Sequence, residues 1–459
     1  MFDVAIIGAG FAGLAAGAKL AGAGARVLVL DARPQLGGRA TAFVDRHTGE
    51  LVDNGQHVLF GCYGETLQFL RRIGAEDHVR FQSTLEVPFL DRAGRRSVLR
   101  CPPLPSPLHL LAGVLDWDAL PWGDRLSTLR IAGPLRRARR GDVPVAPQTV
   151  SEWLTASGQG AKVREWLWEP LSVAALNQSP DEAAAAPFIR VLARMFGPDS
   201  SAAAIVLPNR PLHLMYAEPA RDFITARGGE VRTNALARLV VEGGRVTAVE
   251  IRGDRITIDR AIAAVPWFAL RPLFAGNVPP PMQSIVSAAE AMVSKPIVTV
   301  NLWYDRQVMQ DAFVGLPGRT MQWVFEKRVA FGEEASHLSV VSSAAGDIAG
   351  TATDDLIQLA AAEIAGALPG ARHATLVRGT VVREKRATFS LAPGQPPRPF
   401  TITPVEGLAL AGDWIDTGLP GTIESAVLSG HWAAEEVLTR VNDECRMPNA
   451  ECRMPNAEC

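Results

Sequence analysis

The chain has 459 residues, of which 47% are hydrophobic and 20% are charged, and its formal net charge is −2. These values are ordinary for a globular protein, and the length allows two or three domains with large cores. The near-neutral charge gives no support for a nucleic-acid partner. Three of the five cysteines lie in a repeated C-terminal segment, so there is no disulfide framework and we expect a reducing compartment.

The first residues have the pattern of a strand, a tight turn and a helix. Residues 4–7 are apolar, Gly8, Gly10 and Gly13 form a G-x-G-x-x-G motif, and residues 11–22 are rich in alanine. In such a motif the glycines allow the turn, the approach of a pyrophosphate and close packing of the helix. The free N–H groups at the start of the helix then face the phosphates. The motif predicts a dinucleotide site; the alternative is a glycine-rich turn in an unrelated α/β fold.

A second strand, residues 26–30, ends at Asp31, which lies 18 residues after Gly13. An acid at this position is placed to bind a ribose diol. Residues 4–24 are apolar enough to suggest a membrane span, but their six glycines and the absence of a basic leading segment argue against a span or a signal peptide.

The residues after Asp31 favour FAD over NAD. They read ARPQLGGRA and contain Arg33, Gly37, Gly38 and Arg39. Adjacent glycines bring the backbone close to an extended cofactor chain, and an arginine offsets phosphate charge. The segment resembles the R-x-x-x-G-G-R motif that follows the glycine fingerprint in the FAD enzymes of the amine oxidase and phytoene desaturase superfamily.

A matching element lies near the other end of the chain. LALAG at 408–412 is predicted to be a buried strand, and Asp413, a glycine-bearing loop and a helix at 426–438 follow it. This order resembles the C-terminal cofactor motif of the same superfamily. The resemblance implies that Asp413 contacts the cofactor chain and that Thr422 and Ile423 lie near the pyrimidine edge of the flavin, where a helix dipole stabilises negative charge. For Asp413 taken alone, the alternative is a helix cap.

A third segment, residues 231–265, combines alternating apolar residues with turns. Gly243 and Gly244 predict a hairpin turn between two strands, and AIAAVP ends the segment as a buried strand. It resembles the middle cofactor segment of the superfamily. The implied fold class is α/β, with a Rossmann-like FAD-binding domain of the glutathione reductase and amine oxidase type and an inserted α+β substrate domain.

The resemblance divides the chain into alternating pieces. The FAD-binding domain is expected to comprise residues 1–74, 216–274 and 386–440, and the substrate domain residues 75–215 and 275–385. The tail, residues 441–459, repeats the unit ECRMPNA; proline in each unit and little apolar surface predict disorder, with a metal site as the alternative. We expect no metal elsewhere.

The expected cofactor contacts follow from these motifs. They are Gly8, Gly10, Phe11, Ala12, Gly13, Asp31, Ala32, Arg33, Gly37, Gly38, Arg39, Gly55, Gln56, Ala237, Gly412, Asp413, Gly421, Thr422 and Ile423.

Two further segments indicate which branch of this superfamily the chain resembles. DNGQHVLFGCY at 53–63 and WEPLSVAALNQSPDEAAA at 168–185 are similar to the squalene-associated branch of the phytoene desaturase family, the hydroxysqualene dehydroxylases of hopanoid biosynthesis. That family implies a C30 isoprenoid alcohol as substrate, loss of its hydroxyl as water, and hydride delivery from reduced FAD to give squalene. NADPH or a partner reductase would supply the electrons.

The polar segment at 53–57 supplies the catalytic candidates. Asp53 and His57 are the expected proton donors, with Gln56 beside them. The alternative is that Gln56 and His57 only bind the flavin or brace the loop. Glu169 is a more distant candidate acid.

Apolar and aromatic residues of the substrate domain predict where a hydrocarbon is held. Trp153, Trp166, Trp168, Phe188 and Phe196 have helical spacing that fits either a tunnel or an ordinary core.

Residues 102–140 place Trp117 and Trp122 before a run of arginines, which suits a segment lying at an anionic membrane surface. An ordinary surface excursion is the alternative. We expect a cytoplasmic protein that lies peripherally on the inner face of a bacterial membrane.

Other functions use the same motifs. An oxidative desaturase would move hydride from substrate to flavin, and an amine oxidase would act on a nitrogen substrate. A non-enzymatic lipid-binding protein is a third possibility, against which the complete cofactor motifs argue.

Overall fold

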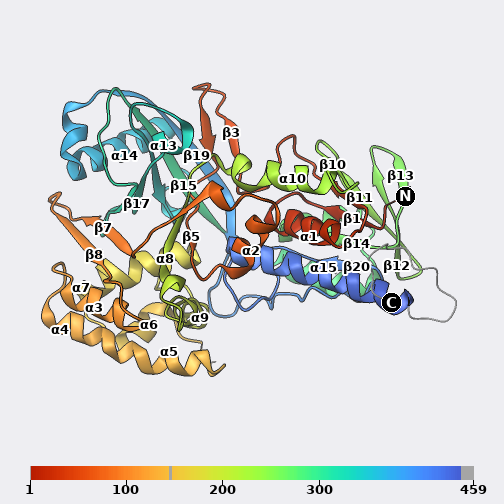
Figure 1. Cartoon of the computed structure of the whole chain (residues 1–459), viewed down its shortest axis with the longest axis horizontal. Helices are drawn as coiled ribbons and strands as arrows, with labels where there is room; N and C mark the ends of the chain where they lie inside the picture. Colours follow the sequence, from red (N-terminus) through yellow and green to blue (C-terminus); the bar gives the residue numbers. More distant parts are fainter. Residues whose placement is uncertain (1, 144–146, 446–459) are drawn as a thin grey trace.

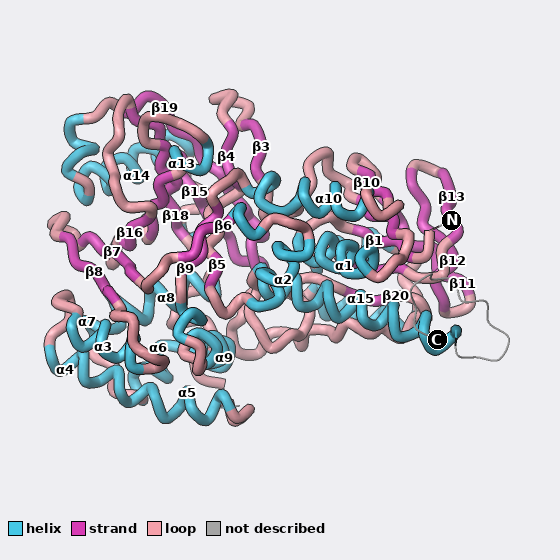
Figure 2. The backbone as a smooth tube through the Cα atoms, in the orientation of Figure 1, coloured by secondary structure: helices cyan, strands magenta, loops and turns pink. Residues whose placement is uncertain are grey.

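The computed structural model describes residues 2–143 and 147–445. The molecule is elongated: one end carries a parallel sheet between helices and a small antiparallel sheet, and the other carries a larger mixed sheet with helices on both faces (Figure 1). Figure 2 shows that the strands of the two ends belong to separate sheets.

The parallel sheet has five strands in the order β10-β2-β1-β14-β20. Their bounds are Glu230–Arg232, Val27–Leu30, Val4–Ile7, Ala261–Ala263 and Leu408–Leu410. Neighbouring strands pair in parallel register throughout, for example Ile6 with Val29 on one side and with Ile262 on the other. Strands β2, β1 and β14 and the edge strand β20 are buried, because both faces of the sheet are covered.

Alternate residues of β1 enter two different cores. Val4 and Ile6 pack with the helices α1 (Phe11–Gly22), α10 (Glu218–Thr225) and α15 (Ile423–Cys445). Ala5 and Ile7 face a layer that contains the antiparallel strands β11 (Ala237–Glu242), β12 (Arg245–Ile251) and β13 (Asp254–Thr257). This division follows from the two-residue period of a strand.

Helices α1 and α15 lie against each other, although they come from opposite ends of the chain (Figure 1). Gly430 makes this approach possible, because a Cβ atom there would lie 2.2 Å from the carbonyl oxygen of Ala12. The C-terminal cofactor motif is thereby held beside the N-terminal one.

The larger sheet has seven strands in the order β19-β15-β18-β17-β16-β7-β8. Their bounds are Leu376–Phe389, Ser294–Tyr304, His337–Ser342, Trp323–Glu326, Phe313–Gly315, Glu86–Leu90 and Arg96–Arg100. Val298, Val300 and Leu302 of β15 face α14 (Thr353–Ala367), whereas Ile297 belongs to the core of the opposite face.

Helices cover that opposite face. They are α3 (Leu108–Asp116), α4 (Trp122–Ser127), α5 (Ala132–Arg139), α6 (Val150–Ala156), α7 (Ala161–Val163), α8 (Glu169–Leu176) and α9 (Ala185–Met195). The remaining helices are α2 (Gly64–Arg72), α11 (Leu270–Leu273), α12 (Gln283–Glu290) and α13 (Arg328–Phe331). Short strands complete the fold: β3 (Ala42–Val44) pairs with β4 (Leu51–Asp53), and β9 (Ile205–Pro208) pairs with β5 (Leu59–Phe60) and β6 (Val79–Phe81).

The elements predicted around the cofactor motifs are confirmed. The first strand and helix have the expected bounds, and Gly243 and Gly244 join β11 to β12 as a hairpin. One prediction is wrong: residues 441–445, assigned to a disordered tail, continue helix α15 to Cys445. The rest of the predicted tail, residues 446–459, lies outside the described residues.

Candidate flavin and substrate cavity

One cavity of about 810 Å³ joins the two ends of the molecule. It begins at the glycine turns of the parallel sheet, passes the loop of residues 54–58, and continues over the seven-stranded sheet to helices α3 and α5. It thus lies outside the carboxyl ends of the parallel strands, where ligands bind in α/β sheets.

The predicted cofactor residues converge on this cavity. All of them line it except Gly13. A Cβ atom at Gly13 would lie 1.9 Å from the carbonyl oxygen of Gly8, so this glycine permits the packing of α1 against the turn. Ala237, predicted from the middle segment, lines the cavity at the start of β11.

The first glycine turn leaves room for a ligand. Gly8 has φ +110°, and a Cβ atom there would lie 2.3 Å from the Ala264 carbonyl oxygen. At Gly10 a Cβ atom would meet nothing closer than 3.9 Å, and no side chain caps the start of α1. The uncapped N–H groups at this helix start form an anion site that suits a pyrophosphate.

Asp31 stands at the end of β2 and is 8% exposed. One carboxylate oxygen accepts a hydrogen bond from the Ala9 N–H at 2.7 Å, and the other accepts from the Arg33 N–H at 2.8 Å. Each oxygen keeps a further lone pair, so the carboxylate braces the glycine turn and still has acceptors for a ribose hydroxyl.

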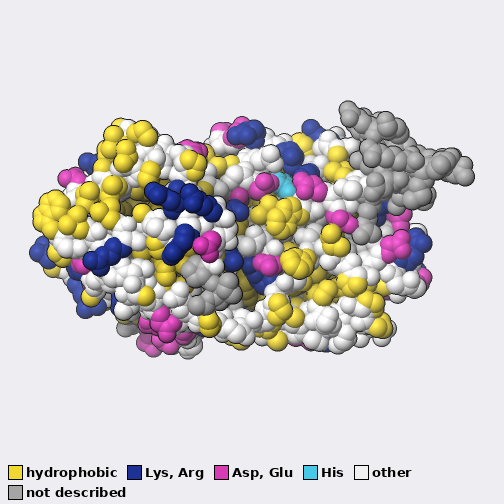
Figure 3. All heavy atoms as spheres, turned by 90° about the horizontal axis from the view of Figure 1, so that it is seen from below, with side chains coloured by type: hydrophobic (Ala, Val, Ile, Leu, Met, Phe, Trp, Pro, Cys, Tyr) yellow, Lys and Arg dark blue, Asp and Glu magenta, His cyan; other side chains and the backbone are white. Residues whose placement is uncertain are grey.

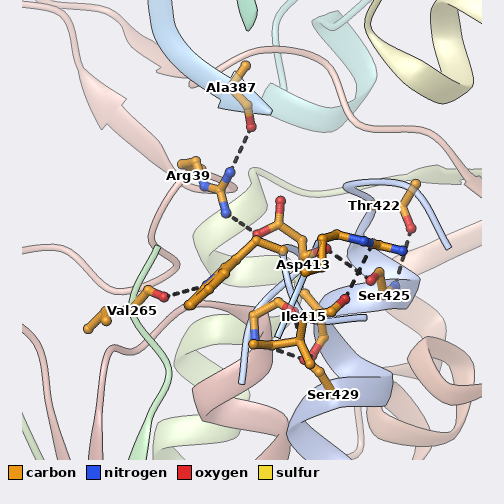
Figure 4. Close-up of polar contacts among 12 residues, drawn as sticks. Arg39, Val265, Ala387, Asp413, Ile415, Thr422, Ser425 and Ser429 are labelled. Carbon is orange, nitrogen blue, oxygen red and sulfur yellow. Dashed lines mark hydrogen bonds and ion pairs between the residues drawn. The ribbon is translucent and has the colours of Figure 1, made fainter. Parts of the chain in front are cut away.

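Arg39 and Asp413 connect the two cofactor motifs. The Arg39 guanidinium forms an ion pair with the Asp413 carboxylate and donates a hydrogen bond to the Ala387 carbonyl oxygen at 2.8 Å (Figure 4). The Asp413 side chain is 8% exposed. Charge-assisted contacts of this kind hold the residues in one geometry, so segments 374 residues apart meet at the cofactor side of the cavity.

The loop before α15 is fixed by hydroxyl groups. Ser425 donates to the Asp413 carbonyl oxygen at 3.1 Å, and Ser429 accepts from the Gly412 N–H at 2.8 Å (Figure 4). The backbone of Gly412 and Gly421 is thereby presented to the cavity.

Two contacts that sequence analysis missed support these motifs. Tyr216 stacks on Phe11, with 3.6 Å between the ring centroids, and its hydroxyl donates to the Gly37 and Ala40 carbonyl oxygens. Burial raises the pKa of Tyr216 well above its usual value, so the hydroxyl stays a donor. Nothing in the local sequence of Tyr216 indicates this contact.

The second missed contact is made by Glu424 in the first turn of α15. Its carboxylate accepts hydrogen bonds from the Glu65 and Thr66 N–H groups and from the Thr66 hydroxyl at 2.7–3.1 Å. It therefore caps helix α2, which follows the loop of residues 54–63. Burial raises the pKa of the Glu424 carboxyl.

The predicted catalytic residues divide between the cavity and the protein interior. Gln56 and His57 line the cavity, and burial lowers the pKa of the His57 imidazole. Asp53 lies behind the loop and does not line the cavity, and neither does Glu169.

Asp53 forms a buried ion pair with Lys327. Both side chains are 5% exposed, and the Lys327 Nζ lies 2.8 Å from the Asp53 carboxylate and 3.0 Å from the Gln56 amide oxygen. The other carboxylate oxygen accepts from the Leu212 N–H at 3.0 Å. Lys327 therefore positions the loop, and its distance of 274 residues from Asp53 explains why no local pattern revealed it.

Of the aromatic residues predicted to line a tunnel, some line the cavity and others belong to the core. Trp168 and Phe196 line the cavity, whereas Trp153, Trp166 and Phe188 belong to the core beneath it. The cavity wall in this half is apolar. Its aliphatic residues are Leu85, Val87, Leu99, Leu110, Leu111, Val114, Leu129, Ile131, Leu135, Leu167, Leu171 and Met195.

Comparisons with known proteins agree with this arrangement. The family described as "Flavin containing amine oxidoreductase" matches residues 11–438. Hydroxysqualene dehydroxylase from Rhodopseudomonas palustris is 31% identical over 447 residues, covering 95% of this chain and 98% of the relative. The 15-cis-phytoene desaturase from Synechococcus elongatus is 25% identical and covers 96% of both chains.

A solved oxidoreductase from Methanosarcina mazei shows the same fold, with a TM-score of 0.72 at 17% identity, covering 94% of this chain and 100% of that one. Fold and site together define a flavin-dependent oxidoreductase of the two-domain α/β type, which confirms the predicted fold class. The chain belongs to the flavin-containing amine oxidoreductase family, and FAD is its cofactor.

Replacing Arg39 by alanine should weaken FAD binding about 10- to 100-fold, because a charge-assisted hydrogen bond contributes roughly 1.5–3 kcal/mol. Titration of the flavin-free protein with FAD, followed by fluorescence, measures the affinity. The matched control is Arg46→Ala, since Arg46 is exposed and does not line the cavity. Equal FAD affinities of the Arg39→Ala and Arg46→Ala proteins would contradict the placement of Arg39 at the FAD site.

Lys327→Met should lower the free energy of unfolding by about 3–5 kcal/mol, because it leaves the Asp53 carboxylate buried without its partner. Urea denaturation measures the loss. The double variant Asp53→Asn with Lys327→Met should recover part of it, and Lys385→Met, at an exposed lysine, should be near wild type. If the double variant loses as much free energy of unfolding as Lys327→Met, the loss does not come from the Asp53–Lys327 ion pair.

Proposed function

We propose that the chain removes the hydroxyl group of a C30 isoprenoid alcohol, hydroxysqualene, and forms squalene with reduced FAD as hydride donor. One observation carries the proposal: a long apolar chamber opens directly onto the FAD side of the cavity, and polar side chains line the place where the two meet. The 31% identity to a hydroxysqualene dehydroxylase over nearly the whole chain supports the choice of substrate.

The chamber suits a hydrocarbon. Its walls come from helices α3, α5, α8 and α9 and from the floor residues Ile297, Phe313, Phe325 and Val341 of the seven-stranded sheet. Burying apolar surface there supplies binding energy at about 25 cal/mol per Å². An alkyl chain contacts such walls along its whole length, so each of its carbons contributes to the binding energy.

The junction supplies the polar contacts that a single hydroxyl group needs. The side chains that line it are Gln56, His57, Asn177, Thr299, Ser343, Glu384 and Thr388. Asn177 is 4% exposed, and its amide bonds to the Thr388 hydroxyl at 3.0 Å and accepts from the Ala344 N–H at 2.8 Å. These contacts fix the polar end of the chamber.

In this proposal FAD, once reduced, supplies the hydride that replaces the lost hydroxyl group. The residues of the chain orient the alcohol with its oxygen at the polar junction and keep bulk water from the carbon that receives the hydride. NADPH or a partner reductase returns electrons to the flavin.

An oxidative desaturase is the second candidate, since a phytoene desaturase is similar over the same length. The direction of hydride transfer separates the two functions. Anaerobic protein with photoreduced FAD should convert hydroxysqualene to squalene, detected by mass spectrometry. Oxidised protein should form no polyene from squalene. Polyene formation, with no squalene from the alcohol, would favour the desaturase.

We also propose that residues 102–140 contact a lipid surface. Three apolar side chains of this segment are exposed: Leu108 by 53%, Trp122 by 65% and Leu126 by 53%. Basic side chains lie close by, since Arg136 and Arg139 of α5 line the cavity beside Leu135. Figure 3 shows basic side chains among apolar ones on this side of the molecule. Trp117, expected at the interface, is instead 1% exposed and packs in the core.

Attachment in this proposal is peripheral. Within residues 2–143 and 147–445, no helix has the length and apolar character needed to cross a bilayer. Apolar side chains that dip into the interface, with arginines beside anionic head groups, are sufficient for reversible binding.

The protein should therefore sediment with phosphatidylglycerol vesicles, and the double variant Trp122→Ser with Leu126→Ser should bind them at least tenfold more weakly, because each lost apolar side chain removes roughly 1.5–3 kcal/mol of burial. Phe400→Ser is the control, since Phe400 is 70% exposed but lies outside this segment. A similar loss with Phe400→Ser would place the contact elsewhere.

A further inference from the structure

We infer that Glu384 is the acid that gives a proton to the departing hydroxyl group. This assignment rests on the proposed dehydroxylation and replaces the proton donors expected at residues 53–57. The structure supports it through the position of Glu384, its hydrogen bonds and the roles of the other acids.

Glu384 lies on the sheet face that forms the floor of the cavity. In the antiparallel pairing of β15 with β19, Glu384 is opposite Ile297 and Val382 is opposite Thr299, and all four residues line the cavity. The intervening Arg383 turns to the other face, where it donates to the Thr351 carbonyl oxygen at 2.7 Å. The alternation of the strand thus directs the Glu384 carboxyl towards the polar junction.

Asn54 connects this carboxyl to the loop beside it. The Asn54 amide donates to Glu384 Oε2 at 3.1 Å and to the Arg39 carbonyl oxygen at 2.8 Å. The other carboxyl oxygen accepts from the Arg386 N–H at 3.2 Å. The carboxyl is therefore oriented between the cofactor motif at Arg39 and the loop that carries Gln56 and His57.

The other carboxyl groups of the described cavity lining already have cofactor-side roles. They are Asp31, which braces the first glycine turn, and Asp413, which pairs with Arg39. Among the described residues none forms an ion pair with Glu384, whose carboxyl oxygens accept hydrogen bonds from Asn54 and Arg386 instead.

His57 is less suited to the task. Burial lowers the pKa of its imidazole, so it is neutral at neutral pH, and a neutral imidazole is a poor acid. Asp53 cannot reach the substrate, because it is ion-paired behind the loop.

The Glu384 carboxyl transfers its proton to the substrate hydroxyl oxygen, the carbon–oxygen bond breaks with its electron pair going to oxygen, and water leaves. Reduced FAD, when bound, would supply the hydride that the carbon accepts, and FAD would lose two electrons. A nicotinamide or protein reductant would return these electrons to the flavin, and a solvent proton would return to Glu384.

The test compares Glu384→Gln with wild type in single turnovers of FAD-reduced protein with hydroxysqualene. Loss of a general acid costs about 10²- to 10⁴-fold, so squalene formation should slow by at least 100-fold. FAD affinity and the rate of flavin reoxidation by oxygen should stay unchanged, which a merely structural role would not predict. Glu406→Gln, at an exposed glutamate outside the cavity, is the matched control.

A second measurement uses Glu384→Ala with added formic acid, which should restore part of the rate if a missing acid is the only defect. A Glu384→Gln rate within threefold of wild type would overturn the assignment and leave the proposed function standing. Failure of wild-type protein to form squalene, with its flavin reduced, would overturn the proposed function and this assignment together.

Discussion

Burial of the parallel sheet on both faces is the constraint on which the site depends. Strands β1, β2, β14 and β20 contain almost only apolar residues, so they are stable only with layers on each side. The covering layers come from segments far apart in the chain, among them α1 and α15. Because parallel strands present their carboxyl ends at one edge, the two glycine turns and Asp413 converge there, and Arg39 can bridge them.

The second constraint is the meeting of the two sheets. The long strand β19 reaches from the substrate end to Phe389, which packs in the core beneath the parallel sheet. Ala387, near the end of β19, lines the cofactor side of the cavity, Thr388 lines the polar junction, and Val382 lines the chamber floor. A single rigid strand therefore sets the distance between the cofactor and the polar end of the chamber, and β15 beside it fixes the register.

Much of the cofactor site was predictable from local sequence, because each motif places its contacts within a few residues. Gly8, Gly37 and Gly412 have positive φ values that favour glycine, and such positions leave a direct mark on the sequence. Contacts between distant segments leave no such mark. Lys327, Tyr216 and Glu424 contact partners that are distant in the sequence. Glu384 is one charged residue within a long strand, so the sequence around it gives no sign of its contacts.

The aromatic residues illustrate the same limit. Helical spacing indicates that Trp153 and Trp168 face inward, but not whether the inside is core or chamber. In the structure, Trp153 on α6 packs in the core, whereas η3 (Arg164–Trp168) turns Trp168 but not Trp166 towards the cavity. Similarly, the stretch before the arginines correctly suggested exposed apolar groups at Trp122 but not the burial of Trp117.

The order of the strands also governs when a ribosome-bound chain can finish folding. Strand β20 begins at Leu408, 404 residues after Val4 of β1, so the sheet lacks an edge strand for most of synthesis, roughly 20–80 s at bacterial translation rates. Until β20 and α15 emerge, β14 lacks one neighbouring strand and α1 lacks the helix that packs against it, so apolar surface on both stays open to aggregation or to chaperones. A nascent chain stopped before Leu408 would already carry the first glycine turn, yet it would lack Asp413 and the ion pair that joins this residue to Arg39 at the cavity.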